Sequence, residues 1–439
     1  MTGAAWQVRP SAALAGTVAV PGDKSISHRV MLLGAIASAP LEAAGFLNSD
    51  DCLATQRAVE ALGARVDTLA DGTLRVTPPA ALCSPAGPLD LGNSGTAMRL
   101  LAGVLAGRGI DAVLTGDDSL LRRPMERVAG PLRSMGARIE TSGSCPPLKI
   151  SAAGPLAPLD YDMPVASAQV KSALLLAGLS AEGRTVVRQP APSRDHTERM
   201  LAALGCSVET GEWGAAVIGP CQPQGGRFTV PGDFSSAAFF LVGGLLAGGE
   251  TPLELKDVGL NPTRTGLLEI LRMMGGRIEI SGLRETCGEP VADLRVWRST
   301  LRGVDIPPEL VPLAIDEFPA LFVAAALAEG MTRVRGAAEL RVKESDRIAV
   351  MARGLEALGV RVREQADGLQ VEGGGLEPGS VDSGGDHRIA MAFAMGAARA
   401  RGPVRILDVA NVATSFPGFL ETAARAGLDI QPMIAGSAA

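Results

Sequence analysis

A pattern of apolar and polar positions recurs along the chain about every 73 residues. In each copy, apolar residues at helical spacing run into a glycine, and a short β-branched segment typical of a strand follows. The six glycines are 68 to 84 residues apart, at positions 63, 136, 205, 275, 359 and 427. We predict that each glycine ends a helix with a positive φ, and that the longest spacing contains an insertion around residues 281–300.

A second set of segments is apolar on nearly every side and rich in small residues, which predicts buried helices. These segments span residues 30–37, 97–106, 173–179, 237–247, 320–328 and 389–398. Their polar starts are near Lys24, Ser94, Ser167, Asp233, Asp316 and Asp386. The helices that end at the repeated glycines, such as residues 54–62 and 198–204, carry more charge and are expected on the outside.

One further similarity divides the six copies into two halves of three. The sequence Val-Pro-Gly-Asp at Val20–Asp23 returns at Val230–Asp233. We therefore expect the chain to pass between two pseudo-equivalent domains near residues 21 and 231, with Pro-Gly hinges in place of a flexible linker.

Composition and charge narrow the functional classes. The 439 residues are 46% hydrophobic with a net charge of −6, which disfavours disorder and a general nucleic-acid binder. No apolar run reaches the ~20 residues that span a bilayer, so no membrane partner is expected. The six cysteines are scattered and no secretory signal is apparent, which favours reduced thiols and a cytoplasmic location.

Basic residues recur at the expected N-terminal ends of helices, where the helix dipole favours anionic side chains. Two of the five lysines and all three histidines lie in these turns. Arg123-Pro124, Ser193–His196 and Lys343–Arg347 are expected to open outer helices, and Asp386–Arg388 a buried one. Because helix N-termini bind phosphate and carboxylate groups, these turns predict a site for small polyanions. If the two halves face each other, this site lies in the cleft between them.

Two acidic residues could move protons among these cations. Asp316 is either the N-cap of a buried helix or a base, and Glu344 lies between Lys343 and Arg347. The chain has no phosphate-binding P-loop, dinucleotide-binding glycine motif or HExxH motif, so these nucleotide and metal chemistries are unsupported.

Six stretches of sequence resemble, in chain order, the 5-enolpyruvylshikimate-3-phosphate (EPSP) synthase family. They are residues 21–29, 91–99, 167–173, 341–347, 386–390 and 415–417. The resemblance implies an α/β fold, a two-domain inside-out α/β barrel in which each domain has three repeated βαβαββ-type units. The domains would be residues 21–231, and residues 1–20 plus 232–439, with the active site in the interdomain cleft.

The family's reaction, as the resemblance implies it, transfers the enolpyruvyl group of phosphoenolpyruvate to the 5-hydroxyl of shikimate 3-phosphate and releases phosphate. This is the sixth step of the shikimate pathway to chorismate and the aromatic amino acids. It needs no cofactor and no metal. The resemblance also implies a monomer and makes glyphosate the expected inhibitor.

The family's site residues are carried over by motif position. Shikimate 3-phosphate would be bound by Lys24, Ser25, Arg29, Ser167, Ala168, Gln169, Arg194, Asp316 and Lys343. Phosphoenolpyruvate would be bound by Lys24, Gly95, Arg123, Gln169, Glu344, Arg347, His387 and Arg388. The catalytic residues would be Asp316, Glu344 and Lys24. Asp316 would accept the proton of the 5-hydroxyl, Glu344 would transfer a proton at the methylene carbon, and Lys24 would contact both substrates.

Some positions depart from the pattern of many family members. Ala168 replaces a serine, Arg194 a tyrosine and Leu100 a proline, and Thr414 is found near the C-terminus where several members have a lysine. The changes at Ala168, Arg194 and Thr414 resemble a class that is often less sensitive to glyphosate, whereas Gly95 resembles the sensitive class. The sequence therefore leaves both responses open.

Two other interpretations compete with this one. An enolpyruvyl transferase acting on UDP-N-acetylglucosamine would need a reactive cysteine in residues 117–123, and none is there. A repeat scaffold without catalysis would give no reason for cations to gather at helix starts.

Overall fold

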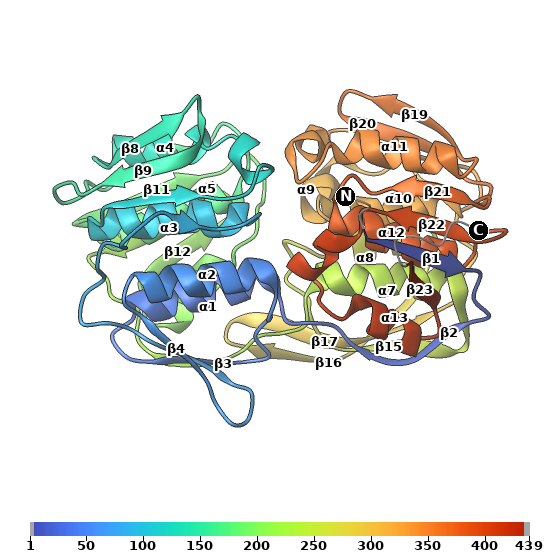
Figure 1. The fold of residues 1–439 in the computed structure, drawn as a ribbon, viewed down its shortest axis with the longest axis horizontal. Coiled ribbons are helices and arrows are strands. Elements are labelled where there is room, and N and C mark those ends of the chain that lie inside the picture. The colour runs from blue at the N-terminus through green and yellow to red at the C-terminus, as the bar shows by residue number, and fades with distance from the viewer. Residues whose placement is uncertain (1–3, 434–439) are drawn as a thin grey trace. The chain divides into compact units, whose positions relative to one another are not determined.

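The computed structural model describes residues 4–433, and these divide into two compact units (Figure 1). The N-terminal unit comprises Gly22–Pro231 together with the short segment Glu285–Glu289. The C-terminal unit comprises the chain up to Pro21, Gly232–Arg284 and the chain from Pro290 onward. No feature of the sequence predicts that Glu285–Glu289 belongs to a different unit from its neighbours along the chain.

The N-terminal unit is a mixed α/β structure with three four-stranded sheets and three buried helices. The strand orders are β14-β3-β5-β4, β6-β7-β9-β8 and β10-β11-β13-β12. In each sheet the first pair is parallel and the other pairs are antiparallel. The helices are α1 (Lys24–Ile36), α2 (Asp50–Ala61), α3 (Gly95–Arg108), α4 (Glu126–Ser134), α5 (Ala168–Gly178) and α6 (His196–Ala203), with the 3-10 helix η1 (Leu120–Arg122). The strands are β3 (Leu41–Ala44), β4 (Arg65–Thr68), β5 (Leu74–Thr77), β6 (Leu89–Asp90), β7 (Ala112–Thr115), β8 (Arg138–Ser142), β9 (Cys145–Ser151), β10 (Asp160–Asp162), β11 (Gly183–Arg188), β12 (Val208–Gly211), β13 (Gly214–Gly219) and β14 (Gly226–Thr229).

The C-terminal unit is built in a similar way, with sheets ordered β16-β17-β15-β2, β18-β20-β19 and β21-β22-β1-β23. The N-terminal strand β1 lies between β22 and β23 and is antiparallel to both. The helices are α7 (Phe234–Ala247), α8 (Gly266–Met273), α9 (Val311–Ala314), α10 (Phe318–Ala326), α11 (Arg347–Ala357), α12 (His387–Ala397) and α13 (Phe419–Arg425), with the 3-10 helices η2 (Pro308–Leu310), η3 (Ala338–Val342) and η4 (Ala410–Thr414). The strands are β1 (Ala5–Arg9), β2 (Leu14–Ala19), β15 (Gly248–Gly259), β16 (Arg277–Thr286), β17 (Glu289–Trp297), β18 (Met331–Val334), β19 (Arg361–Gln365), β20 (Gly368–Glu372), β21 (Gly379–Asp382), β22 (Val404–Leu407) and β23 (Asp429–Met433).

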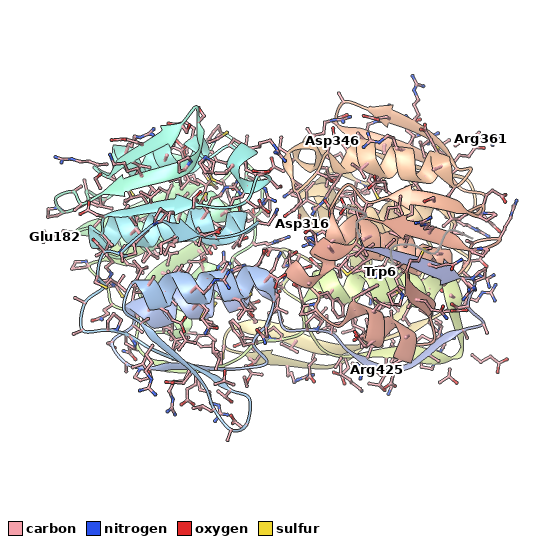
Figure 2. The ribbon with its side chains drawn as sticks, in the orientation of Figure 1. Trp6, Glu182, Asp316, Asp346, Arg361 and Arg425 are labelled. Carbon is pink, nitrogen blue, oxygen red and sulfur yellow. The ribbon has the colours of Figure 1, made fainter. Side chains whose placement is uncertain are left out.

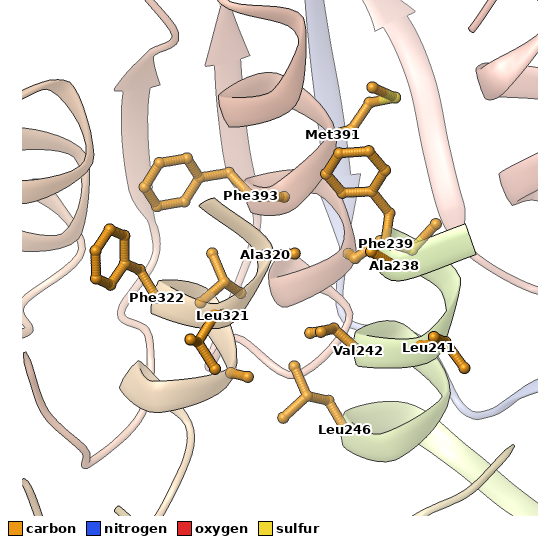
Figure 3. Close-up of a cluster of buried hydrophobic side chains, with 14 of the residues drawn as sticks. Ala238, Phe239, Leu241, Val242, Leu246, Ala320, Leu321, Phe322, Met391 and Phe393 are labelled. Atoms are coloured by element: carbon orange, nitrogen blue, oxygen red, sulfur yellow. The ribbon is translucent and has the colours of Figure 1, made fainter. Parts of the chain in front are cut away.

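The predicted buried helices are confirmed, and they form the core of each unit. Figure 3 shows side chains of α7, α10 and α12 meeting in one cluster, among them Phe239, Leu321 and Phe393. In the N-terminal unit, α3 and α5 approach so closely that a Cβ at Gly103 would be 2.2 Å from the Ala173 carbonyl oxygen. Small residues are therefore required where these helices touch.

The predicted glycine helix ends are also confirmed. All six repeated glycines have a positive φ, between 79° and 104°. The predicted insertion around residues 281–300 is a long hairpin formed by β16 and β17. Within the described part of the chain, no helix has both the length and the apolar character needed to cross a membrane.

The two Val-Pro-Gly-Asp segments pair with each other through the backbone. The Asp23 amide donates to the Pro231 carbonyl, and the Asp233 amide donates to the Pro21 carbonyl, each over 2.8 Å. Asp23 and Pro231 belong to the N-terminal unit, and Asp233 and Pro21 belong to the C-terminal unit, so each bond lies within one unit.

Candidate active site

In the N-terminal unit, the three buried helices begin at capped polar turns. The Asp23 carboxylate accepts from the Ile26 amide at 2.9 Å, the Ser94 hydroxyl from Ala97 at 3.2 Å, and the Ser167 hydroxyl from Val170 at 3.4 Å. These caps fix the first turns of α1, α3 and α5, where most of the predicted ligands of this unit lie.

Lys24 is the first residue of α1 and is held by a carboxylate. Its Nζ lies 2.9 Å from Oδ2 of Asp51, in the first turn of α2, and its side chain is 16% exposed. Asp51 was not predicted as a site residue, because an acidic residue in the first turn of an outer helix is common and no other signal in the sequence distinguishes it. Ser25, the next residue, is partly buried.

Arg29 is buried within a network of oxygen atoms. Its Nε donates to the Thr197 hydroxyl at 2.6 Å, one Nη to the Ser25 carbonyl at 2.8 Å, and the other Nη to the Ser172 hydroxyl at 2.8 Å. Burial lowers the pKa of Arg29 to about 10, so the group stays charged at neutral pH. A buried cation among hydroxyl and carbonyl oxygens favours a nearby anion.

Two further arginines, Arg99 of α3 and Arg123 after η1, lie beside the start of α3. Arg123 donates to Oδ1 of Asn93 at 2.5 Å, and Arg99 donates to the side-chain oxygen of Gln169. Gln169 in turn donates to the Thr96 hydroxyl at 2.8 Å. Arg99 lies within the motif at residues 91–99 but no role was predicted for it, although its spacing of four from Gly95 places both residues on one helix face.

The remaining predicted ligands of this unit are at the starts of α5 and α6. Ala168 is the first residue of α5 and is partly buried. Arg194, also partly buried, lies in the loop two residues before α6 begins at His196.

In the C-terminal unit, Asp316 is found in the turn between α9 and α10 (Figure 2). Its Oδ1 is 3.4 Å from Nζ of Lys343 and 3.3 Å from an Nη of Arg347. The side chain is 12% exposed, so the carboxylate is largely shielded while remaining reachable. Because α10 begins at Phe318 with Glu317 as its N-cap residue, the alternative that Asp316 is the N-cap is wrong.

Arg347 is the centre of a buried cluster of charges. Its Nε lies 2.8 Å from Asp386 and an Nη lies 2.7 Å from Glu344, in addition to the contact with Asp316. Burial alone would lower the pKa of Arg347, but the carboxylates of Asp386, Glu344 and Asp316 raise it above its ordinary value. Arg347 therefore holds both predicted proton-transfer carboxylates on one guanidinium group.

Arg388 and His387 open α12, as predicted, behind the N-cap Asp386. Arg388 donates to the Asp316 carbonyl at 3.0 Å and lies 3.6 Å from Glu317. His387 is buried. Burial opposes ionisation of Asp386, but Arg347 lowers the pKa of this carboxyl, which favours its charged form at the helix start.

Two expectations need correction. Arg123-Pro124 does not open an outer helix: α4 begins at Glu126, and Arg123 is extended with φ −78° and ψ 137°. The cause is Pro124, which disfavours helical geometry in the residue before it. The second correction concerns the excess of positive charge that was predicted at the helix starts. This excess is smaller than predicted, because Asp51, Glu317 and Asp386 pair with cations there.

All six cysteines are free, as predicted. In residues 4–433, no group of three or more His, Cys, Asp and Glu side chains is placed to hold a metal ion. The charged groups described in the two clusters are guanidinium, ammonium and carboxylate groups.

A family model for EPSP synthase (3-phosphoshikimate 1-carboxyvinyltransferase) matches residues 8–423. The chain belongs to the EPSP synthase family. It is 56% identical over 430 residues to the 3-phosphoshikimate 1-carboxyvinyltransferase of Alkalilimnicola ehrlichii, with 96% of each chain covered. It is 55% identical to the enzyme of that name from Methylococcus capsulatus, covering 96% of this chain and 97% of that one.

Solved structures agree with membership of the EPSP synthase family. An EPSP synthase from Acinetobacter baumannii superposes with a TM-score of 0.88 at 47% identity, covering 98% of this chain and 100% of that one. The enolpyruvyl transferase NikO from Streptomyces tendae gives a TM-score of 0.80 at 20% identity over 99% of both chains, which shows a shared fold. As an EPSP synthase family member, the chain is an enolpyruvyl transferase that joins phosphoenolpyruvate to shikimate 3-phosphate in aromatic amino acid biosynthesis.

Proposed function

We propose that the two clusters described above bind the substrates of this transfer and carry out its proton steps. The observation that carries the proposal is the position of Asp316, a shielded carboxylate within 3.4 Å of both Lys343 and Arg347. Two cations keep such a carboxylate ionised and ready to accept a proton. Asp316 takes the proton of the 5-hydroxyl as that oxygen attacks the enolpyruvyl carbon.

Glu344 supplies and recovers the proton at the methylene carbon of phosphoenolpyruvate. Its contact with Arg347 at 2.7 Å orients it, and its side chain is 26% exposed and so accessible to a substrate. Phosphate leaves when the tetrahedral adduct collapses, and Lys24, Arg123, Arg347, His387 and Arg388 stabilise the charge on the phosphate and carboxylate groups.

In this proposal, shikimate 3-phosphate is bound mainly by the N-terminal unit. Lys24, Ser25, Arg29, Ser167, Ala168, Gln169 and Arg194 all lie at or beside the starts of α1, α5 and α6. Helix N-termini with basic side chains favour a phosphate. Asp316 and Lys343 complete this set, while Gly95 and Gln169 contact phosphoenolpyruvate. Both clusters act on one pair of substrates, as the family pattern implies.

The finer architecture is part of the same proposal. We propose that each unit is an inside-out α/β barrel made of three βαβαββ-type repeats, which is supported by the three sheets and three buried helices in each. We also propose that the domain limits are residues 21–231, and residues 1–20 plus 232–439.

We further propose that the enzyme is cytoplasmic, that it is a monomer and that glyphosate inhibits it. Gel filtration with light scattering and inhibition kinetics test the last two points.

The deciding experiment is phosphate release from phosphoenolpyruvate by the purified protein. Release should require shikimate 3-phosphate as co-substrate, and its absence above background would refute the proposal. The Lys24→Met variant should raise the KM for phosphoenolpyruvate, because it removes the cation at the start of α1. An unchanged rate and KM would refute direct contact.

A further inference from the structure

Three consecutive side chains in the first turn of α6 are buried although all are polar. They are His196, Thr197 and Glu198, each no more than 2% exposed. The proposed mechanism uses none of them. Each is bound by a different partner, so this turn is a junction between several elements.

Thr197 and Glu198 tie the turn to the other buried helices of the N-terminal unit. The Thr197 hydroxyl accepts from Arg29 at 2.6 Å and donates to Ser172 of α5 at 2.7 Å. Glu198 Oε1 is 2.8 Å from Nζ of Lys171, which also donates to the Ser193 carbonyl at 3.3 Å. The turn therefore fixes Arg29 and also the loop that carries Arg194.

His196 ties the same turn to the tip of the β16–β17 hairpin. Its Nδ1 lies 2.7 Å from Oε1 of Glu289, which is 3% exposed. Among the described residues, His196 Nε2 has no hydrogen-bond partner, so Glu289 makes the one side-chain hydrogen bond of this histidine. Arg199, one turn further along α6, donates to the Gly288 carbonyl at 2.6 Å.

The hairpin tip has an unusual place in the chain. The arms of β16 and β17 belong to the C-terminal unit, whereas Glu285–Glu289 belong to the N-terminal unit. A buried ionisable pair is costly to desolvate and is weak evidence for stability, so stability alone does not explain why the tip ends in a buried carboxylate.

We propose that Glu289 is a positioning residue for shikimate 3-phosphate. By holding His196, it fixes the first turn of α6 and so sets the positions of Arg194, two residues earlier, and of Arg29 through Thr197. This inference rests on the proposed roles of Arg29 and Arg194. Small displacements of positioned groups have large effects on binding and rate.

The test compares Glu289→Ala and Glu289→Gln with the wild-type enzyme. Calorimetric titration should show shikimate 3-phosphate binding about tenfold weaker in Glu289→Ala, since the turn is released. Glutamine can still accept from Nδ1, so Glu289→Gln should lose less affinity. The KM for phosphoenolpyruvate at saturating shikimate 3-phosphate should not change. The matched control is Glu285→Gln, at an exposed position of the same hairpin tip, which should bind like wild type.

A double-mutant cycle separates positioning from a general loss of structure. If Glu289 acts through His196, Glu289→Ala combined with His196→Ala should bind no more weakly than His196→Ala alone. Equal losses for both substrates, or additive losses in the cycle, would overturn the proposal. The Arg194→Leu variant separates failure of the proposed site from failure of the positioning role. Normal shikimate 3-phosphate binding by Arg194→Leu would refute the proposed site. Weak binding by Arg194→Leu together with normal binding by Glu289→Ala would refute only the positioning role.

Discussion

At the scale of single residues, the chemistry depends on how carboxylates and cations share contacts. Asp316 contacts Lys343 and Arg347, and Arg347 also contacts Glu344 and Asp386. A carboxylate placed this way remains an anion until it accepts a proton from substrate.

Replacing Asp316 by Asn should therefore reduce kcat by about 100-fold or more, because the proton acceptor is lost while the shape is kept. Calorimetry should still detect shikimate 3-phosphate binding. The matched control is Asp346→Asn, at the N-cap of α11, where asparagine caps equally well. A kcat for Asp316→Asn close to that of this control would contradict the assignment.

Gly95 offers a second prediction, since its missing side chain leaves room for two guanidinium groups. A Cβ there would be 3.0 Å from an Nη of Arg123 and 3.4 Å from one of Arg99. Gly95→Ala should displace Arg123 and raise the KM for phosphoenolpyruvate about tenfold, with a similar loss of glyphosate inhibition.

The control for this prediction is Gly130→Ala in α4, where the nearest atom to an added Cβ is Glu126 Oε1 at 3.7 Å. Steady-state kinetics should find it unchanged. If Gly95→Ala also keeps the wild-type KM and inhibition, Arg123 does not bind phosphoenolpyruvate from this position.

Much of the site could be predicted at this scale, but the counter-charge of Lys24 could not. Lys24 and Arg347 lie in family motifs, and Asp316 is an acidic residue near the expected start of a buried helix. Asp51 belongs to no such motif, and it meets Lys24 only because α1 and α2 pack side by side. Ion pairs between residues far apart in sequence depend on packing that local patterns do not encode.

At the scale of elements, His28 links three helices at the start of the N-terminal unit. Its Nδ1 is 2.8 Å from the Thr55 hydroxyl on α2, and its Nε2 is 3.4 Å from Ser94, the N-cap of α3. Burial first, and then the charges of Lys24 and Arg29, lower the pKa of His28 to about 3. The imidazole is therefore neutral in the folded protein.

This lowered pKa predicts how stability depends on pH. The unfolded chain binds a proton at His28 below about pH 6.5, whereas the folded protein binds it only near pH 3. The contribution of His28 is thus complete above pH 6.5 and is lost as the pH falls, by up to about 1.4 kcal/mol per pH unit.

Urea unfolding of wild type and His28→Asn between pH 4 and 7 checks the prediction. The variant lacks the ionisable group, so its free energy of unfolding should fall less steeply with decreasing pH. Parallel curves for the two proteins would show that His28 does not contribute to the acid sensitivity.

Helices were easier to predict than their exact starts. Runs of small apolar residues identified the buried helices, and glycines at the helix ends identified the outer helices. Both signals are local in the sequence. The start of α4 was predicted wrongly, because Pro124 follows a 3-10 turn and the extended residue Arg123, and the helix begins only at Glu126. The crossing of Glu285–Glu289 into the N-terminal unit was not predicted, since it rests on contacts made far along the chain.

At the scale of the whole molecule, the proposed ligands are divided unequally between the units. Most residues assigned to shikimate 3-phosphate lie in the N-terminal unit, so this substrate alone should stabilise the protein. At 100 times its Kd, a ligand that binds only the folded state adds about 2.7 kcal/mol.

Thermal unfolding with and without shikimate 3-phosphate should show this as a rise in Tm that depends on ligand concentration. The shift should be much smaller in Lys24→Met at the same concentration and should persist in Asp346→Asn. A shift of equal size in all three proteins would mean that binding does not involve the start of α1.

The position of β1 also determines the order in which the protein can be completed during synthesis. This strand is made long before its partners β22 and β23, which begin at Val404 and Asp429. At about 5 to 20 residues per second, a ribosome needs roughly 20 to 80 s to make the intervening chain. Gly22–Pro231 can meanwhile form all of its sheets from its own residues. Strand β1 therefore waits for its partners long after it has left the ribosome, and it can take its place in this sheet of the C-terminal unit only after β22 and β23 have been made.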